Sequence, residues 1–577
     1  MLAAFLLAVL LPQVDWIDTG RRYVKAWNAG KVNLQAPVAL DRPGFLDPRN
    51  AKIVELVKAR GDKFHWTAEA ELSFICSGLA AAVGDDGADV LWQLGLVRIG
   101  NDAVAELRNR AAAKRQPWLV RHTVLATIAK GSGTRYAARA VDVLGRFGQE
   151  DFDPIAANFA CAVLARCGGI EHRATVEKLL ASDEVRVRGA ALAAIRAIGA
   201  SLSLKRLVPL LDNEKSVAVR CAIWHALGGI VSALGDPDKR DPNEHVDRII
   251  AHAVATLKDL QRPLVEGVAV CRFIWNARPL EILRELPDCL AAHQETAGGH
   301  ATLRWWIWGL LNDMHGTGTE RRRNRRGQLG TGFTAGANEP EKWKQFLAGR
   351  RRLYALRRGR ETSRPPFPAG TPTLFGLPLF GKRIRIIVDC SEASGAPFTG
   401  VNRDGSTTEK TTVHERIAEE LRTVLAKLPA TTTVFVECWS KRGKTLASKS
   451  RERLADLVGE QRPRGPSNPS GALLRHIRAA QPIETANIAD VDSIYWLCTS
   501  PPTAGTIQSP QTLVDVLLSA QPSCPVPIHV ALFADRRKAR FGYKLSRLLR
   551  GLSKKLRRLG EESGGSYSYV IRPGQKK

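Results

Sequence analysis

The residues best suited to chemistry follow an apolar run in the last third of the chain. The run RIRIIV at 383–388 has the character of a buried strand, and it ends in Asp389, which is followed by the sequence CSEAS. Carboxylate and hydroxyl oxygens are the ligands that a hard divalent cation such as Mg²⁺ prefers. We therefore expect a site lined by oxygen atoms at this strand end, with Asp389 at its centre.

Other motifs in the chain do not complete a catalytic site. The sequence GKT at 443–445 ends like a phosphate-binding loop, but Cys438 stands where that loop requires a glycine. The glycines between 316 and 332 have no strand before them, and no histidine pair has metalloprotease spacing. No glycine precedes Ser394 by two positions, as a nucleophile elbow requires. We expect no enzyme activity, and a hydrolase with an unrecognised site stays as a third alternative.

Strands and helices alternate from Lys382 to the end of the chain, which predicts an α/β domain. Apolar runs typical of strands lie at 383–391, 432–440, 491–500, 527–534 and 566–570, and amphipathic helical stretches lie at 411–428, 469–480, 510–520 and 543–560. Continuous apolar strands that alternate with helices predict a doubly wound, mostly parallel sheet covered on both faces.

The segment 375–571 resembles a von Willebrand factor A-like domain. The first strand and its DCSEAS end are similar to the Asp-x-Ser-x-Ser motif of that family, and the helix and strand after it have the expected order. The block RPRGPSNPSG is similar to the loop that supplies a further hydroxyl, and VDSIYWLCTSPP is similar to the strand that ends in Leu-Thr-Asp-Gly. The resemblance implies a metal-ion-dependent adhesion site at these three strand ends.

Matched residue by residue, that site is degenerate. The resemblance assigns the first carboxylate to Asp389, the first hydroxyl to Ser391 and the loop hydroxyl to Ser467, while Ala393 stands at the second serine and Ser500 at the second aspartate. Ser394 and Glu392 would reach an ion only from a shifted backbone. Because Mg²⁺ gains most from carboxylate charge and requires near-octahedral geometry, we expect no cofactor, or at most weak Mg²⁺ or Mn²⁺ binding. The binding residues expected at the rim are Asp389, Ser391, Ser394, Ser467 and Ser500.

The segment 50–315 predicts an all-α solenoid. Three Ala- and Leu-rich stretches begin at Ile155, Val187 and Val219, so the spacing is 32 residues twice, and in each a glycine follows the last apolar turn. Each copy is a helix pair that cannot bury its apolar face alone, so neighbouring copies must stack. The copies resemble HEAT-like repeats, with a Val-Arg pair that opens the second helix. We expect the tryptophans of ATLRWWIWGLL, which are Trp305, Trp306 and Trp308, to pack the end of this array.

The net charge of +28 is concentrated in two segments. The segment 321–360 has 13 Lys or Arg and 2 Glu, and 536–558 has 11 Lys or Arg and no acid, which together supply 22 of the 28 charges. This excess suits a polyanion such as nucleic acid or an anionic surface, while a solubilising surface remains the alternative. The polyanion candidates are Arg321, Arg322, Arg323, Arg325 and Arg326. The leucine stripe of the helix at 543–560 favours packing on the sheet over membrane anchoring.

The residues at the N-terminus and the stretch after the solenoid have different compositions. Residues 1–20 begin with MLAAFLLAVLL, which has the length of a signal-peptide core, so we expect an exported protein of the periplasm, cell envelope or extracellular space; an apolar helix packed on the next domain is the alternative. The Gly- and Pro-rich stretch at 316–372 predicts a basic linker between halves that fold independently.

The ten cysteines are scattered singly, which argues against a zinc site or a disulfide framework.

These observations predict a non-enzymatic protein that binds other proteins or acts as a scaffold. The solenoid would offer an extended groove and the α/β domain a second binding face. The alternative is polyanion binding through the basic linker and the C-terminal basic helix. The sequence names no protein partner and predicts no integral membrane span.

Overall fold

The computed structural model describes most of the chain and divides it into two compact units. Described are residues 16–29, 68–82, 85–96, 117–130, 134–199, 204–234, 243–294, 300–315, 335–349, 371–379, 381–398, 411–440, 443–448, 450–479, 491–503, 507, 509–522, 525–534 and 543–571. The first unit comprises residues 1–198 with 506–508, and the second comprises 199–505 with 509–577. The helical region thus contributes to both units, and the α/β region lies in the second apart from residues 506–508.

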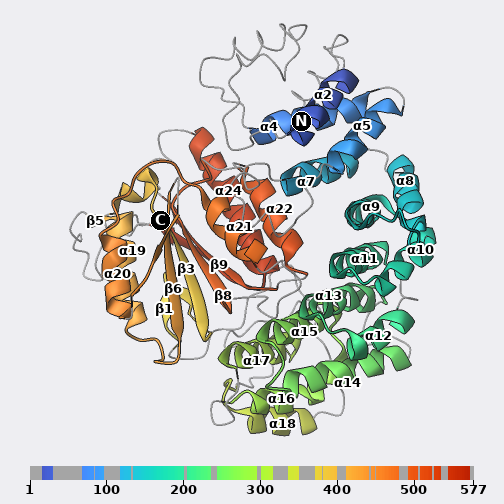
Figure 1. Cartoon of the computed structure of the whole chain (residues 1–577). Coiled ribbons are helices and arrows are strands. Elements are labelled where there is room, and N and C mark those ends of the chain that lie inside the picture. Colours follow the sequence, from blue (N-terminus) through green and yellow to red (C-terminus); the bar gives the residue numbers. More distant parts are fainter. Residues whose placement is uncertain are drawn as a thin grey trace. The chain divides into compact units, whose positions relative to one another are not determined.

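Helices make up the described part of the first unit (Figure 1). They are α2 (Trp16–Asn28), α4 (Ala68–Ala81), α5 (Asp86–Gly95), α7 (Pro117–Ile128), α8 (Thr134–Gly145), α9 (Pro154–Cys167), α10 (Arg173–Lys178) and α11 (Val185–Ile198). The second unit begins with α12 (Leu204–Asn213), α13 (Val217–Ala233), α14 (Glu244–Lys258), α15 (Leu264–Ala277), α16 (Leu286–Ala292), α17 (Ala301–His315) and α18 (Pro340–Ala348). A helical N-terminal region is therefore confirmed.

The three repeat copies coincide with α9, α11 and α13, and two of them share one arginine interaction. In α11 the Arg188 guanidinium donates to the carbonyl oxygens of Ser182 and Asp183 at 2.7 and 3.0 Å. In α13 the Arg220 guanidinium donates to those of Glu214 and Lys215 at 2.9 and 3.0 Å. The arginine that opens the helix thus satisfies the carbonyl groups of the preceding turn in both copies.

The prediction that a glycine follows the last turn of each repeat helix is correct for α11 and wrong for α13. Gly199, which follows α11, has a φ of +71°, as a helix C-cap requires. Gly228 does not end α13, which continues to Ala233. An added Cβ at Gly228 would lie 3.4 Å from the Phe273 Cα of α15, so this glycine allows two helix backbones to approach.

A buried ion pair joins α13 to α15. Arg220 Nε and Nη2 each donate to a carboxylate oxygen of Glu266 at 2.9 Å, and Glu266 is only 1% exposed. A bidentate pair of this kind fixes the relative orientation of two helices.

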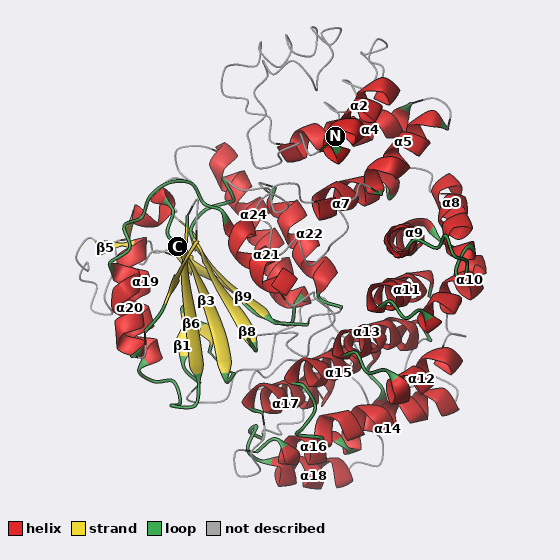
Figure 2. Cartoon of the chain, viewed as in Figure 1, coloured by secondary structure: helices red, strands yellow, loops and turns green. Residues whose placement is uncertain are grey.

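The α/β region contains one six-stranded sheet (Figure 2). Its strands, in spatial order, are β10 (Tyr567–Ile571), β9 (Ile528–Ala534), β8 (Ser493–Cys498), β3 (Arg383–Asp389), β6 (Thr433–Trp439) and β7 (Gly443–Leu446). Neighbouring strands are parallel except for β7, which is antiparallel to β6. In the central strand, Ile386 lies opposite both Val436 and Tyr495. A mostly parallel sheet is confirmed.

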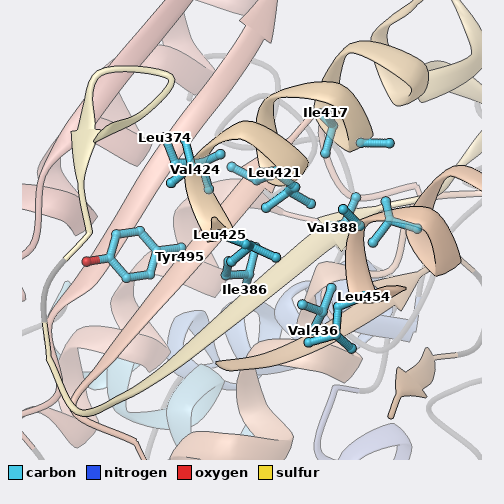
Figure 3. Packing of buried hydrophobic residues seen from close by; sticks show 14 of the residues in the cluster. Leu374, Ile386, Val388, Ile417, Leu421, Val424, Leu425, Val436, Leu454 and Tyr495 are labelled. Atoms are coloured by element: carbon cyan, nitrogen blue, oxygen red, sulfur yellow. The ribbon is translucent and has the colours of Figure 1, made fainter. Parts of the chain in front are cut away.

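Helices cover both faces of this sheet (Figure 1). On one face lie α19 (Val413–Leu425) and α20 (Arg451–Gly459), and on the other lie α21 (Pro469–Ala479), α22 (Pro510–Ala520) and α24 (Tyr543–Glu562). The core under α19 is formed by residues such as Ile386, Val388, Ile417, Leu421 and Val436 (Figure 3). In α24, Leu552, Leu556 and Leu559 are at most 4% exposed, so this part of its apolar stripe faces protein as predicted.

Some short elements were not predicted from the sequence. They are β7, α20, the hairpin of β1 (Thr373–Leu374) with β2 (Leu377–Pro378), and the pair β4 (Pro397–Phe398) with β5 (Thr411–Thr412). The expected linker contains α18, which packs on α16 and buries Trp343 completely. This part of 316–372 therefore has a packed core, contrary to our expectation.

The last helices of the array contact the α/β region within the second unit. Arg272 of α15 donates to Gln521 Oε1 at 2.9 Å and to the backbone oxygen of Glu562 at 2.6 Å. A Cβ added at Gly564 would lie 2.6 Å from the indole of Trp306, so that ring packs directly on this glycine. Trp305, Trp306 and Trp308 are all at most 8% exposed, which agrees with their predicted packing role. These contacts argue against our expectation that the two halves fold independently.

Among the described helices, none has both the length and the apolar character needed to cross a membrane.

We predict that Arg272→Ala destabilises the second unit by about 1–2 kcal/mol, because two hydrogen bonds between α15 and the α/β region are lost. Hydrogen exchange of the whole chain should accelerate around Gln521 and Glu562, and chemical denaturation should show the loss of stability. Arg284→Ala, which removes an exposed arginine that follows α15 in the chain, serves as the control. Unchanged exchange in Arg272→Ala would mean that the contact does not couple the two regions.

Candidate functional site

The candidate site lies at the carboxyl end of β3, where the chain changes from adding strands on one side of β3 to adding them on the other. From β3 the chain proceeds outward to β6 and β7, and it then returns to β8 on the other side of β3. In open α/β sheets, the carboxyl ends of the two strands at such a switch point border the ligand crevice. Asp389 ends β3, and Thr499 directly follows β8. The strand order itself therefore brings these two side chains together.

Asp389 is 4% exposed and accepts hydrogen bonds from three loops. Its Oδ1 accepts from the backbone N–H of Ser391 at 3.0 Å. Its Oδ2 accepts from the hydroxyl and N–H of Thr499 at 2.6 and 3.2 Å, and from the Ser467 hydroxyl at 3.2 Å. The Ser500 hydroxyl lies at the limit, 3.5 Å away. Neutral donors thus compensate the buried carboxylate charge.

Backbone hydrogen bonds join the same loops around Asp389. Arg464 N donates to the carbonyl oxygen of Cys390 at 3.1 Å, and Glu392 N donates to that of Gly465 at 2.9 Å. Ser467 and Thr503 exchange two bonds, since Ser467 N donates to Thr503 Oγ1 and Thr503 N donates to Ser467 O, both at 2.9 Å. The loops after β3 and β8 and the loop before α21 therefore form one connected surface.

The two serines of the DCSEAS segment play different parts. Ser391 is 2% exposed, and its hydroxyl has no hydrogen-bond partner among the described residues. Ser394 is fully buried, and its hydroxyl donates to the Ser391 carbonyl oxygen at 2.8 Å. Ser394 therefore stabilises its own turn, and in the described part of the chain its hydroxyl makes no hydrogen bond to Asp389.

Thr499 and Thr503 contribute to the site and were not among the predicted residues. Thr499 makes the shortest hydrogen bond to Asp389, and Thr503 fixes the backbone of Ser467. The position of Thr499 directly after an apolar strand beside β3 could have identified it, because carboxyl ends of parallel strands meet at one edge. Thr503 lies four residues further along a proline-containing loop, and no sequence pattern marks it.

A thiol and an imidazole lie beside Asp389, and their surroundings shift the pKa of each. The side-chain hydrogen bond with Cys438 and burial raise the pKa of the Cys390 thiol, and burial lowers the pKa of His414. The His414 Nδ1 lies 4.0 Å from Cys390 Sγ, and its Nε2 contacts the Val458 carbonyl oxygen at 2.7 Å. Both groups are therefore neutral near pH 7, and a reactive thiolate does not form. The nine described cysteines are all free.

Within the described ranges, no group of three or more His, Cys, Asp or Glu side chains is placed to hold a metal ion. The arginines at 321–326 lie outside the described residues, as does the apolar run at 1–11. In α24, Lys554 and Arg557 are exposed, while Arg558 pairs with Asp515 and Glu562 at 2.7 and 2.9 Å.

Comparisons with known proteins assign no relative. No protein-family model matches the chain, and no curated protein matches it.

We predict that Thr499→Val destabilises the protein by about 1.5–3 kcal/mol, because Asp389 loses a hydrogen bond from a hydroxyl to a buried charge. Thr499→Ser keeps the hydroxyl and should cost less than about 1 kcal/mol. Chemical denaturation of the whole chain measures both, and Thr423→Val, at an exposed position of α19, is the matched control. Equal losses in all three variants would show that the hydroxyl of Thr499 does not stabilise the carboxylate.

Proposed function

We propose that this chain is a non-enzymatic protein that binds other proteins through the carboxyl edge of a von Willebrand factor A-like domain attached to a HEAT-like array. The observation that carries the proposal is the hydrogen bonding of Asp389. Its oxygens accept from donors of three loops, and the neighbouring thiol and imidazole are neutral. The edge therefore has a fixed surface without an activated nucleophile.

The strand order supports the assignment of the α/β domain. The central strand β3 ends in Asp389, the antiparallel strand β7 lies at one edge, and β8, β9 and β10 follow in order on the other side. Hydroxyl residues from the loop before α21 and from the end of β8 meet this aspartate, as the sequence resemblance implies.

The repeated arginine geometry supports the HEAT-like assignment. Arg188 and Arg220 are 32 positions apart, and each bonds to carbonyl oxygens five and six residues earlier. Shared geometry at the repeat period is expected when helix pairs of one type are stacked.

The donor set fits a tightly bound dication poorly. One carboxylate contributes charge, its Oδ2 is already surrounded by hydroxyl and N–H donors, and Ala393 and Ser500 replace the remaining family ligands. The Ser391 hydroxyl is the group best able to turn toward an ion. We therefore keep only weak Mg²⁺ or Mn²⁺ binding in the proposal. Export of the protein, based on residues 1–11, is part of the same proposal.

We predict that titration calorimetry of the whole chain with MgCl₂ or MnCl₂ gives dissociation constants of about 1 mM or weaker, because one carboxylate supplies too little charge for tight binding. Asp389→Asn, which removes the charge and keeps the shape, should abolish any heat that is seen. Low micromolar binding that Asp389→Asn removes would show that a functional ion site survives.

We predict that a protein partner from the native host crosslinks to the carboxyl edge. A photoreactive phenylalanine derivative at the exposed positions Glu392 and Thr503 should yield the same crosslinked protein, identified by mass spectrometry. The same group at Lys427, an exposed residue between α19 and β6 at the other edge of the sheet, is the control. Crosslinks from Lys427 alone, or equal products from all three positions, would contradict binding at this edge.

A further inference from the structure

Two arginines beside the site have no partner, although they lie in a well-fixed loop. Arg462 and Arg464 are exposed, and in the described part of the chain neither guanidinium has a hydrogen bond or an ion pair. The loop 460–468 that carries them connects α20 to α21 and includes Ser467, one of the donors to Asp389.

The arginines of the neighbouring helices behave differently. Arg416 pairs with Glu419 and Glu420 at 2.6 and 3.2 Å, and Arg422 pairs with Asp456 at 2.7 Å. In α20, Arg451 donates to backbone carbonyl oxygens, including that of Leu428 at 2.7 Å. Arg453 pairs with Glu460, also at 2.7 Å. All four arginines of α19 and α20 are thus satisfied within the chain, and those of the loop are not.

The backbone of the loop is fixed on both sides of Arg464. Arg464 N donates to the Cys390 carbonyl oxygen, the Gly465 carbonyl oxygen accepts from Glu392 N, and Gly465 has a φ of +71° that favours glycine. Pro463 and Pro466 restrict the chain further. A surface held in this way loses little conformational entropy when a ligand binds.

The charges around the loop favour a short acidic ligand. Lys444 is exposed and donates to Gln461 Oε1 at 3.2 Å, so it adds a third positive charge beside the two arginines. Glu460 is paired with Arg453, and the exposed Glu392 is joined to the loop by its N–H, which donates to the Gly465 carbonyl oxygen. A nucleic acid would need an extended row of cations to neutralise several phosphates, which this compact group does not offer. Guanidinium groups pair with carboxylates through paired N–H donors.

We propose that the loop 460–468 binds an acidic segment of a protein partner, with Arg462 and Arg464 pairing with its carboxylates. This inference rests on the proposed function, since it names the chemistry of the partner at the same edge of the sheet.

The test uses a fluorescein-labelled peptide of eight glutamates as the probe. The full chain carries Ser in place of Arg321, Arg322, Arg323, Arg325 and Arg326, so that those arginines do not contribute to binding. In this background, R462Q/R464Q should weaken peptide binding about tenfold or more, because two charge-assisted pairs are lost. R416Q/R422Q removes the same charge from α19 and should change the affinity by less than about twofold, because those arginines already have partners in the chain.

A gain of affinity provides an independent readout. Glu392→Gln removes the repelling carboxylate and should strengthen peptide binding, a change opposite in direction to the loss of a folded binding site. The inference is wrong if both arginine pairs lower the affinity equally, or if Glu392→Gln has no effect. It is also wrong if R462Q/R464Q weakens binding of a short DNA duplex more than binding of the peptide. If the peptide test fails while the crosslinks at 392 and 503 persist, the acidic ligand is excluded and the proposed function stands.

Discussion

The arrangement of the carboxyl edge depends on one buried carboxylate. Asp389 lies at the end of the central strand, and a carboxylate buried there is tolerated only if donors surround it. Those donors come from the loop after β3, the loop before α21 and the end of β8. Since each loop satisfies part of the same charge, their relative positions are fixed together. The position of the loop that carries Arg462 and Arg464 therefore depends on Asp389, which accepts a hydrogen bond from Ser467 of that loop.

A neutral set of donors and a bound dication are alternative ways to compensate this carboxylate. A dication needs further charge from the protein, whereas hydroxyl and N–H groups need only the correct geometry. Ala393 and Ser500 bring no further carboxylate to this edge, which favours compensation by neutral donors. The Thr499 hydroxyl donates the shortest hydrogen bond to Asp389, at 2.6 Å. The proposed recognition at this edge therefore depends on other groups, for which the arginines of the adjoining loop are suitable.

Apolar patterning predicted the larger elements, and local backbone effects explain the rest. The buried strands β3 and β8, and the amphipathic helices that follow the strands, were predicted directly from continuous apolar runs and helical periodicity. Strand β7 has the sequence GKTL with three exposed residues, so no hydrophobic pattern marks it. Helix α20 is signalled only by its N-cap, Ser450, whose hydroxyl accepts from Arg453 N. Within the site, Asp389 and Ser467 were predictable from order along the chain, but the turn that directs Ser394 away from the carboxylate depends on hydrogen bonds that the sequence does not reveal.

The contacts of the helical array lie at the opposite edge of the sheet. Gln521 and Glu562, which accept from Arg272, lie at the ends of α22 and α24 and precede β9 and β10. The turn at Gly564 and Gly565 cannot accept larger residues, because a Cβ at Gly565 would lie 2.0 Å from the Ile528 oxygen, and the space beside Gly564 is filled by Trp306. At the starts of β3 and β8, Lys382 and Asp492 act on the titration of His300, whose pKa is lowered mainly by burial. Within the second unit, the described contacts of α15 and α17 with the sheet region thus lie at its amino edge. Within the second unit, the residues that hold α15 and α17 against the sheet region are therefore different from those that surround Asp389.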